Sequence, residues 1–107
     1  MSEILQVTDK NFGEALKAPM TIIEFWAPWC PGCTAAKSTI AKIAGELKSQ
    51  VLVVGADIDG SPKATEKYEV TSIPTLVFFR DGKEFYRIDG TTPYRRLMPD
   101  IKSRFGL

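Results

Sequence analysis

The chain contains two cysteines, Cys30 and Cys33, and only two residues separate them. In a helix this spacing places the thiols one turn apart, so they can close a disulfide across the turn or open to a dithiol. A structural zinc site needs about four cysteine or histidine ligands, and the chain has no histidine and no third cysteine. The pair therefore indicates thiol–disulfide exchange, without a metal site. The alternatives are two core cysteines, a passive disulfide, or a metal ion shared between two chains.

The composition is that of an ordinary soluble globular protein. The 107 residues are 44% hydrophobic and 25% charged, which predicts a single domain over residues 1–107. The 14 basic and 13 acidic residues are interleaved, which argues against nucleic acid or an anionic membrane as a partner. No signal peptide or membrane-spanning run is visible. We therefore expect a cytoplasmic protein, where C-x-x-C is more often catalytic or metal-binding than a structural disulfide.

Strand-like and helix-like segments alternate along the chain. Strands are predicted over residues 4–7, 21–26, 51–58, 75–80 and 84–89. Helices are predicted after residues 8–9 as far as Pro19, from the cysteine pair through Leu47, from 61–62 to about Tyr68, and from 92–93 through Phe105. Thr8 or Asp9, Ser61 and Thr92 are suited to cap three of these helices. The order predicts an α/β fold, with parallel strands first and an antiparallel hairpin around Asp81-Gly82 last.

The places of Cys30 and Glu24 in the predicted helix and strand indicate what chemistry each can do. Cys30 follows a predicted strand and opens a predicted helix, so its sulfur meets unpaired backbone N–H groups and the positive end of the helix dipole. Both favour the thiolate, which is the nucleophile in disulfide exchange. Glu24 lies within an apolar strand, on the same face as Trp26. Burial would raise the pKa of Glu24 and allow proton exchange near neutrality; alternatively, its carboxylate reaches the surface.

Several motifs together resemble the thioredoxin family. They are Phe-Trp-Ala-Pro-Trp-Cys-x-x-Cys at residues 25–33, Ile-Pro-Thr at residues 73–75, and the Asp81-Gly82 hairpin followed by Gly90. The similarity extends from about Thr8 to Phe105 with matching spacings, and the combination is highly specific. It implies the thioredoxin fold, a central mixed sheet of about five strands flanked by four helices.

The resemblance implies a role for each site residue. Cys30 attacks a substrate disulfide and Cys33 resolves the mixed disulfide. Glu24 stands where the family usually has an aspartate that takes and returns the proton of the second thiol. Pro74 is implied to be cis and to place the preceding backbone beside the cysteines. The implied substrate-binding surface consists of Trp29, Pro31, Gly32, Ile58, Ile73 and Gly90. Core positions are predicted for Trp26, beneath the site, and for Phe12, Phe25, Phe78 and Phe79.

Four positions depart from the family pattern. The usual Gly-Pro between the cysteines is reversed to Pro31-Gly32, which could move the reduction potential by tens of millivolts. Gly55 stands where many relatives have a lysine near the buried carboxylate. Ser38 stands where the long helix often has a kinking proline, so we expect a straighter helix. Asp89 replaces an apolar residue, and its carboxylate would oppose thiolate formation at Cys30 and repel acidic partners.

The implied function is reduction of protein disulfides. The chain would need no bound cofactor, because the two cysteines hold both electrons, and we expect a monomer. A thioredoxin reductase, linked to NADPH or to ferredoxin, would re-reduce it. One alternative is a more oxidising glutaredoxin-like or isomerase-like exchanger, because glutaredoxins and periplasmic oxidants of this fold have the Cys-Pro-x-Cys order. Another is a thioredoxin-fold binding module without catalysis.

Overall fold

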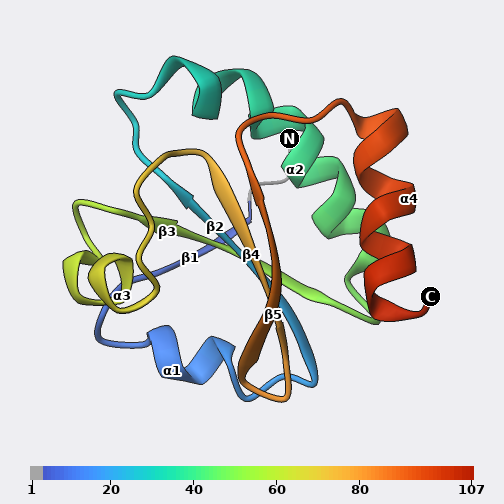
Figure 1. Cartoon of the computed structure of the whole chain (residues 1–107), viewed down its shortest axis with the longest axis horizontal. Coiled ribbons are helices and arrows are strands. Elements are labelled where there is room, and N and C mark those ends of the chain that lie inside the picture. The colour runs from blue at the N-terminus through green and yellow to red at the C-terminus, as the bar shows by residue number, and fades with distance from the viewer. Residues whose placement is uncertain (1–3) are drawn as a thin grey trace.

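The computed structural model describes residues 4–107, which form a five-stranded sheet with helices on both faces (Figure 1). The strands are β1 (Leu5–Val7), β2 (Met20–Trp26), β3 (Leu52–Asp57), β4 (Thr75–Arg80) and β5 (Lys83–Asp89). The helices are α1 (Phe12–Ala15), α2 (Pro31–Leu47), α3 (Pro62–Lys67) and α4 (Tyr94–Phe105). The thioredoxin fold implied by the sequence motifs is confirmed.

The sheet is mixed, with the strand order β1-β3-β2-β4-β5. Strands β1, β3 and β2 are parallel, because helices connect them and return the chain to the same edge. Strand β4 runs antiparallel to β2 and β5. The β4–β5 turn is formed by Asp81 and Gly82, both with positive φ, which is the geometry that this residue pair favours in hairpins.

Side chains alternate along the strands and divide the core into two layers. Helices α2 and α4 cover one face and α1 and α3 the other (Figure 1). On β2, Ile22 packs toward α2 and α4, whereas Ile23 and Phe25 pack toward α1 and α3. The core positions predicted for the phenylalanines are confirmed, because Phe12, Phe25, Phe78 and Phe79 are all buried.

The start of α1 differs from the prediction. Asn11, and not Thr8 or Asp9, occupies its N-cap position. The Asp9 carboxylate instead accepts hydrogen bonds from the backbone N–H groups of Lys63 (3.0 Å) and Ala64 (2.9 Å), at the N-terminus of α3. Asp9 thus caps a helix that lies 54 residues away. A cap of this kind depends on tertiary packing and has no local sequence signal.

The starts of α3 and α4 are also partly different. Ser61 holds the N-cap position of α3 with Pro62 first in the helix, as predicted. The Ser61 hydroxyl, however, donates to the Val7 carbonyl (3.3 Å), because Asp9 already serves the helix. Helix α4 begins at Tyr94 with Pro93 as its N-cap, so the prediction that Thr92 caps it is wrong.

Helix α2 and the loop before it create the end of the molecule that carries the cysteines. Strand β2 ends at Trp26, and α2 begins at Pro31 and runs without interruption for 17 residues. Within residues 4–107, no helix is both long and apolar enough to cross a membrane.

Candidate active site

Cys30 is the N-cap residue of α2. Its extended backbone (φ −95°, ψ 113°) ends the loop from β2, and Pro31 takes the first helical position, where a missing N–H has no cost. The Cys33 backbone N–H donates to Cys30 Sγ over 3.2 Å. Both side chains are buried, with 6% of Cys30 and 5% of Cys33 exposed. The helix N-terminus therefore directs a backbone donor at the Cys30 sulfur, an arrangement that stabilises negative charge there.

The Ile73–Pro74 segment lies beside this sulfur. The peptide bond between the two residues is cis, as the family resemblance implied. Cys30 Sγ is 3.8 Å from the Ile73 carbonyl oxygen. The Pro74 carbonyl accepts a hydrogen bond from the Gly90 N–H (2.8 Å), and Gly90 has a φ of +83° that favours glycine. A side chain at Gly32 would meet Pro74 Cδ at 3.4 Å, so the reversed dipeptide places its small residue against this proline.

Cys33 and Glu24 are both buried. Burial, the hydrogen bond to Cys30 and the negative charge of Cys30, with a smaller effect from Glu24, raise the pKa of the Cys33 thiol to about 12. Glu24 is 6% exposed, and burial raises the pKa of its carboxyl from 4.5 to about 7. Both residues line a cavity of about 360 Å³. Near neutral pH Cys33 is thus a thiol beside a carboxyl group that can take up or release a proton.

The wall of this cavity has a feature that the sequence did not reveal. Gly55 lies directly opposite Glu24 on one side and Gln6 on the other, in the β2–β3 and β1–β3 registers. The Gln6 side chain covers Gly55, because a Cβ there would be 2.6 Å from Gln6 Nε2. Gln6 Oε1 accepts a hydrogen bond from Trp26 Nε1 (2.8 Å). A neutral amide therefore occupies the space over Gly55, and burial is the cause of the raised pKa of Glu24.

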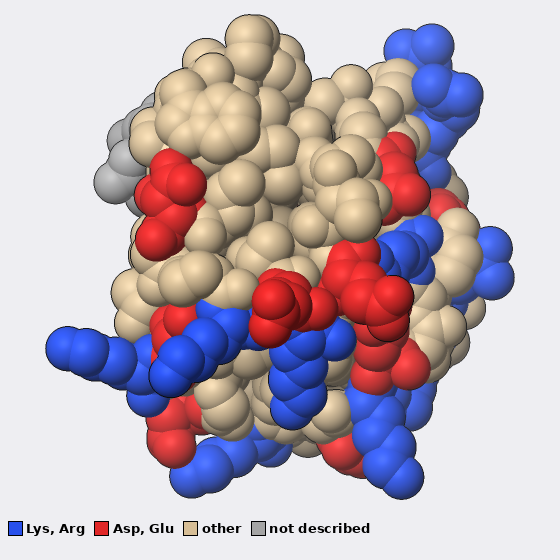
Figure 2. Space-filling model, turned by 60° about the vertical axis from the view of Figure 1, so that its left-hand side comes forward, with Lys and Arg blue, Asp and Glu red and all other residues tan. Residues whose placement is uncertain are grey.

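An apolar surface, formed by Trp29, Ile58, Ile73 and Gly90, surrounds the cysteines, and Pro74, which was also predicted there, is buried. Trp29 is 63% exposed, and its Nε1 donates to Asp59 Oδ2 (2.9 Å). Ile58 and Ile73 are half-buried against the cysteines. Uncharged side chains fill the upper part of the face shown in Figure 2, and acidic side chains border it.

The structure brings the predicted site residues to this one end of the sheet. Trp26 is half-buried and packs against the cysteines, as expected for a residue beneath the site. Sequence reasoning missed Gln6 and Asp59, which hold the two indole rings. These pairs are 20 and 30 residues apart along the chain, so only the fold reveals them. In residues 4–107, no three His, Cys, Asp or Glu side chains are grouped to bind a metal ion.

Comparison with known proteins identifies the family. Residues 3–103 match the model of the Thioredoxin family. Thioredoxin from Staphylococcus saprophyticus is 33% identical over 99 residues, covering 92% of this chain and 95% of the relative. Thioredoxin from Staphylococcus haemolyticus is 34% identical over 94 residues, covering 88% and 90%.

A solved structure gives the same result. The matching chain comes from work on the thiol-resolving mechanism of a yeast mitochondrial 1-Cys peroxiredoxin via glutathione/thioredoxin systems. It superimposes with a TM-score of 0.84 at 28% identity, over 95% of this chain and 99% of that one. Sequence, fold and the paired thiols agree, and the chain belongs to the thioredoxin family of protein thiol–disulfide oxidoreductases.

Proposed function

We propose that the chain reduces disulfides of other proteins, with Cys30 as the nucleophile and Cys33 as the resolving thiol. The asymmetry between the two sulfurs carries this assignment. Cys30 Sγ receives the backbone N–H of Cys33 and lies next to the Ile73 carbonyl. Cys33 has a pKa raised to about 12, which keeps it protonated until a base acts on it.

The reaction takes place in two exchanges. The Cys30 thiolate attacks one sulfur of the target disulfide, forms a mixed disulfide, and releases the other sulfur as a thiolate that takes up a proton. Cys33 then loses its proton and attacks Cys30 Sγ, which breaks the mixed disulfide and releases the second target thiol. The target has gained two electrons and two protons, and the chain holds a Cys30–Cys33 disulfide. A reductase returns two electrons and two protons to reopen it.

Glu24 is the proposed base for the second exchange. Its pKa of about 7 lets it take the Cys33 proton without a strong preference for either protonation state at neutral pH. It shares a cavity with Cys33, and its negative charge acts on that thiol. Glu24 thereby takes the part that an aspartate has in most of the family, even though its side chain is one methylene longer.

The target segment is proposed to lie on the apolar surface. It would run beside the Ile73–Pro74 backbone, with Trp29, Ile58 and Gly90 around it and with Pro31 and Gly32 at the start of α2. Trp29 is suited to this contact because its large ring is exposed while Asp59 fixes its indole N–H. The shallow surface would accept many sequences, because few polar groups on it demand a matching partner.

The proposed setting is the cytoplasm, with a monomeric protein and no bound cofactor. Family membership implies disulfide-containing targets and a reductase partner. We propose a thioredoxin reductase that draws electrons from NADPH or from ferredoxin. Turnover of the purified chain with one reductase of each type distinguishes the two.

Trapping of the intermediate tests the roles of the two cysteines. The Cys33→Ser variant should accumulate a mixed disulfide with insulin or a peptide disulfide, which mass spectrometry would locate at Cys30. The Cys30→Ser variant, which retains the buried thiol, should form almost none. Equal trapping by the two variants would contradict the assignment. In cells, a Cys30→Ser, Cys33→Ser double variant that retained function would favour a binding module over a redox enzyme.

A further inference from the structure

An acidic residue lies at the edge of the apolar surface. Asp89 ends β5 and is paired directly with Thr75 of β4. Thr75 follows Pro74, and the Pro74 carbonyl accepts the N–H of Gly90. Asp89 therefore lies opposite the residue that directly follows the Ile73–Pro74 segment, and this segment approaches the Cys30 sulfur.

The carboxylate is on the same side of the sheet as the Ile73 side chain. Thr75 pairs with Phe25, whose ring belongs to the core under α1 and α3, and Ile73 packs against that core as well. Since cross-strand partners point to the same face, Asp89 also points to this side. A target segment that covers Ile73 thus passes close to the Asp89 side chain.

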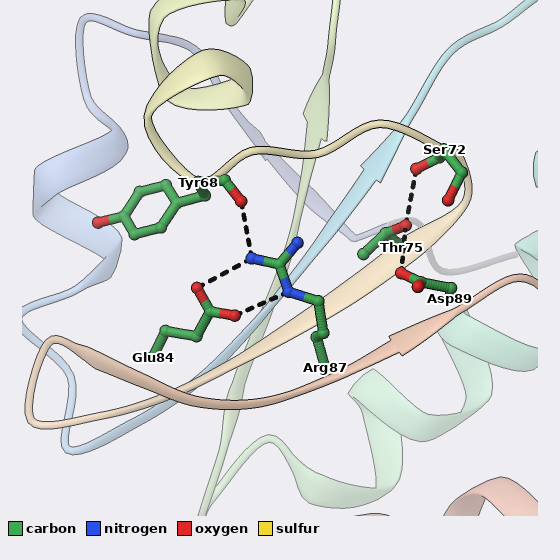
Figure 3. Close-up of polar contacts among 6 residues, drawn as sticks. All are labelled: Tyr68, Ser72, Thr75, Glu84, Arg87 and Asp89. Carbon is green, nitrogen blue, oxygen red and sulfur yellow. Dashed lines mark hydrogen bonds and ion pairs between the residues drawn. The ribbon is translucent and has the colours of Figure 1, made fainter.

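Asp89 keeps most of its capacity to bind a cation. The buried Thr75 hydroxyl is 3.2 Å from Asp89 Oδ1 and 2.7 Å from the Ser72 carbonyl oxygen, and it can donate its one proton to either (Figure 3). No Lys or Arg in residues 4–107 forms an ion pair with Asp89. By contrast, Asp59, the other acid at this surface, accepts the indole N–H of Trp29.

Arg87, two residues before Asp89 on the same strand, is engaged elsewhere. Arg87 donates to both oxygens of Glu84 (2.8 and 3.0 Å) and to the Tyr68 carbonyl oxygen (2.7 Å). Figure 3 shows that these contacts turn its guanidinium away from Asp89. The bond to Glu84 is the main reason that the pKa of Arg87 is raised, and Asp89 adds a smaller attraction over a longer distance.

We propose that Asp89 is a specificity-determining residue, which favours target segments that carry lysine or arginine next to the attacked cysteine. This inference rests on the proposed function. An exposed cation beside Asp89 gains an ion pair, whereas an aspartate or glutamate there is repelled. The apolar surface supplies contact area for any target, and Asp89 adds a preference of charge.

Rates with matched substrates test the proposal. Three short peptide disulfides are used, which differ only in having Lys, Gln or Glu beside the cysteine. The second-order rate of oxidation of the reduced chain is followed by tryptophan fluorescence at low ionic strength. For Asp89→Asn, the ratio of the Lys to the Glu rate should fall by about two- to fivefold, the range expected for one exposed ion pair. About 1 M salt should shrink the wild-type ratio.

The control is Asp81→Asn, which makes the same charge change in the turn at the other end of the β4–β5 hairpin. It should leave the Lys-to-Glu ratio unchanged. The ratio of the Lys to the Glu rate is insensitive to a general effect of Asp89 on the reactivity of Cys30, because such an effect would change all three rates equally. An unchanged ratio in Asp89→Asn overturns the proposal. If none of the peptides oxidises the wild-type cysteines, the proposed function itself fails.

Discussion

Glu24 is the residue that most clearly distinguishes this site from a pair of cysteines on a protein surface. Its carboxyl is buried beside Cys33, and its pKa of about 7 follows from removal from water. A carboxyl in bulk water would be ionised at neutral pH and a weak base. Burial makes Glu24 a stronger base, which suits it to accept the proton of Cys33, whose pKa is itself raised.

The Glu24→Gln variant should separate the two exchanges. Attack by Cys30 should continue at a similar rate, while resolution by Cys33 at pH 7 should slow on the order of a hundredfold, the lower end for loss of a general base. In the wild type, resolution should speed up as the pH rises through about 7, because Glu24 loses its proton there. The variant should lack this step in its pH profile.

Rapid mixing with a peptide disulfide, acid quenching and mass spectrometry would follow the mixed disulfide directly. Glu14→Gln, at an exposed position on α1, is the matched control and should resemble the wild type. Resolution at the wild-type rate in Glu24→Gln would show that water or another group takes the Cys33 proton.

The sequence predicted which residues form the site better than it predicted the contacts that these residues make. The cysteine spacing is a local signal, and the structure bears out the helix start at Cys30. The cis bond before Pro74 is also present, but only the family resemblance implied it. For Glu24 the apolar strand left two alternatives, a buried carboxyl or one that reaches the surface, and the structure shows the buried one. The bond from Trp29 to Asp59 had no local signal, because it joins residues that only the fold brings together.

Gln6, Gly55 and Glu24 are paired across the neighbouring strands β1, β3 and β2. The absence of a side chain at Gly55 allows Gln6 to reach across β3 and accept the indole N–H of Trp26. Because Trp26 packs against the cysteines, the first strand supports the active site from a distance.

A pair of substitutions should reveal this dependence. Gly55→Ala should lower the free energy of unfolding by about 1 kcal/mol, because the new methyl group would push the flexible Gln6 amide aside and break its hydrogen bond with Trp26. In a Gln6→Ala background the same change should cost much less, since the obstructing amide is gone. Urea unfolding of the four proteins would measure the coupling. Additive effects of the two substitutions would contradict this account of the contact.

The elements themselves were largely predictable, whereas their caps were not. Alternating apolar runs and cap-proline pairs predicted all five strands and four helices in order. The errors lie at helix starts, where Asp9 serves α3 instead of α1. An aspartate near a helix is an equally good acceptor for any helix N-terminus within reach, and tertiary packing decides which one it caps.

For the whole molecule, the buried carboxyl of Glu24 couples stability to pH. The unfolded chain releases the Glu24 proton near its ordinary pKa of 4.5, whereas the folded chain holds it until about pH 7. Stability should therefore fall as the pH rises from about 4.5 to 7, and level off above. The shift corresponds to a loss on the order of 3 kcal/mol.

Comparison of the reduced wild type with Glu24→Gln isolates this contribution. Urea unfolding near pH 4 and near pH 8 gives the change in stability of each protein, and other titrating groups affect both alike. From pH 4 to pH 8, the free energy of unfolding of the wild type should fall by on the order of 3 kcal/mol more than that of the variant. Parallel pH dependences in the two proteins would mean that Glu24 titrates normally in the fold.

The mixed sheet followed from the order of elements, because helices between the early strands impose parallel pairing and a short hairpin imposes antiparallel pairing. The cavity beside Glu24 could not be predicted in this way. It depends on how Gln6 and Trp26 fill the space over Gly55, and such packing is visible only in three dimensions.

The reduction potential of the Cys30–Cys33 couple tests the central claim most directly. Equilibration in dithiothreitol and glutathione buffers, followed through the fluorescence of Trp26 and Trp29, would give its value. A reductant should show about −270 mV, the value typical of thioredoxins. A value above about −200 mV would contradict the account and place the chain with the isomerases and oxidants.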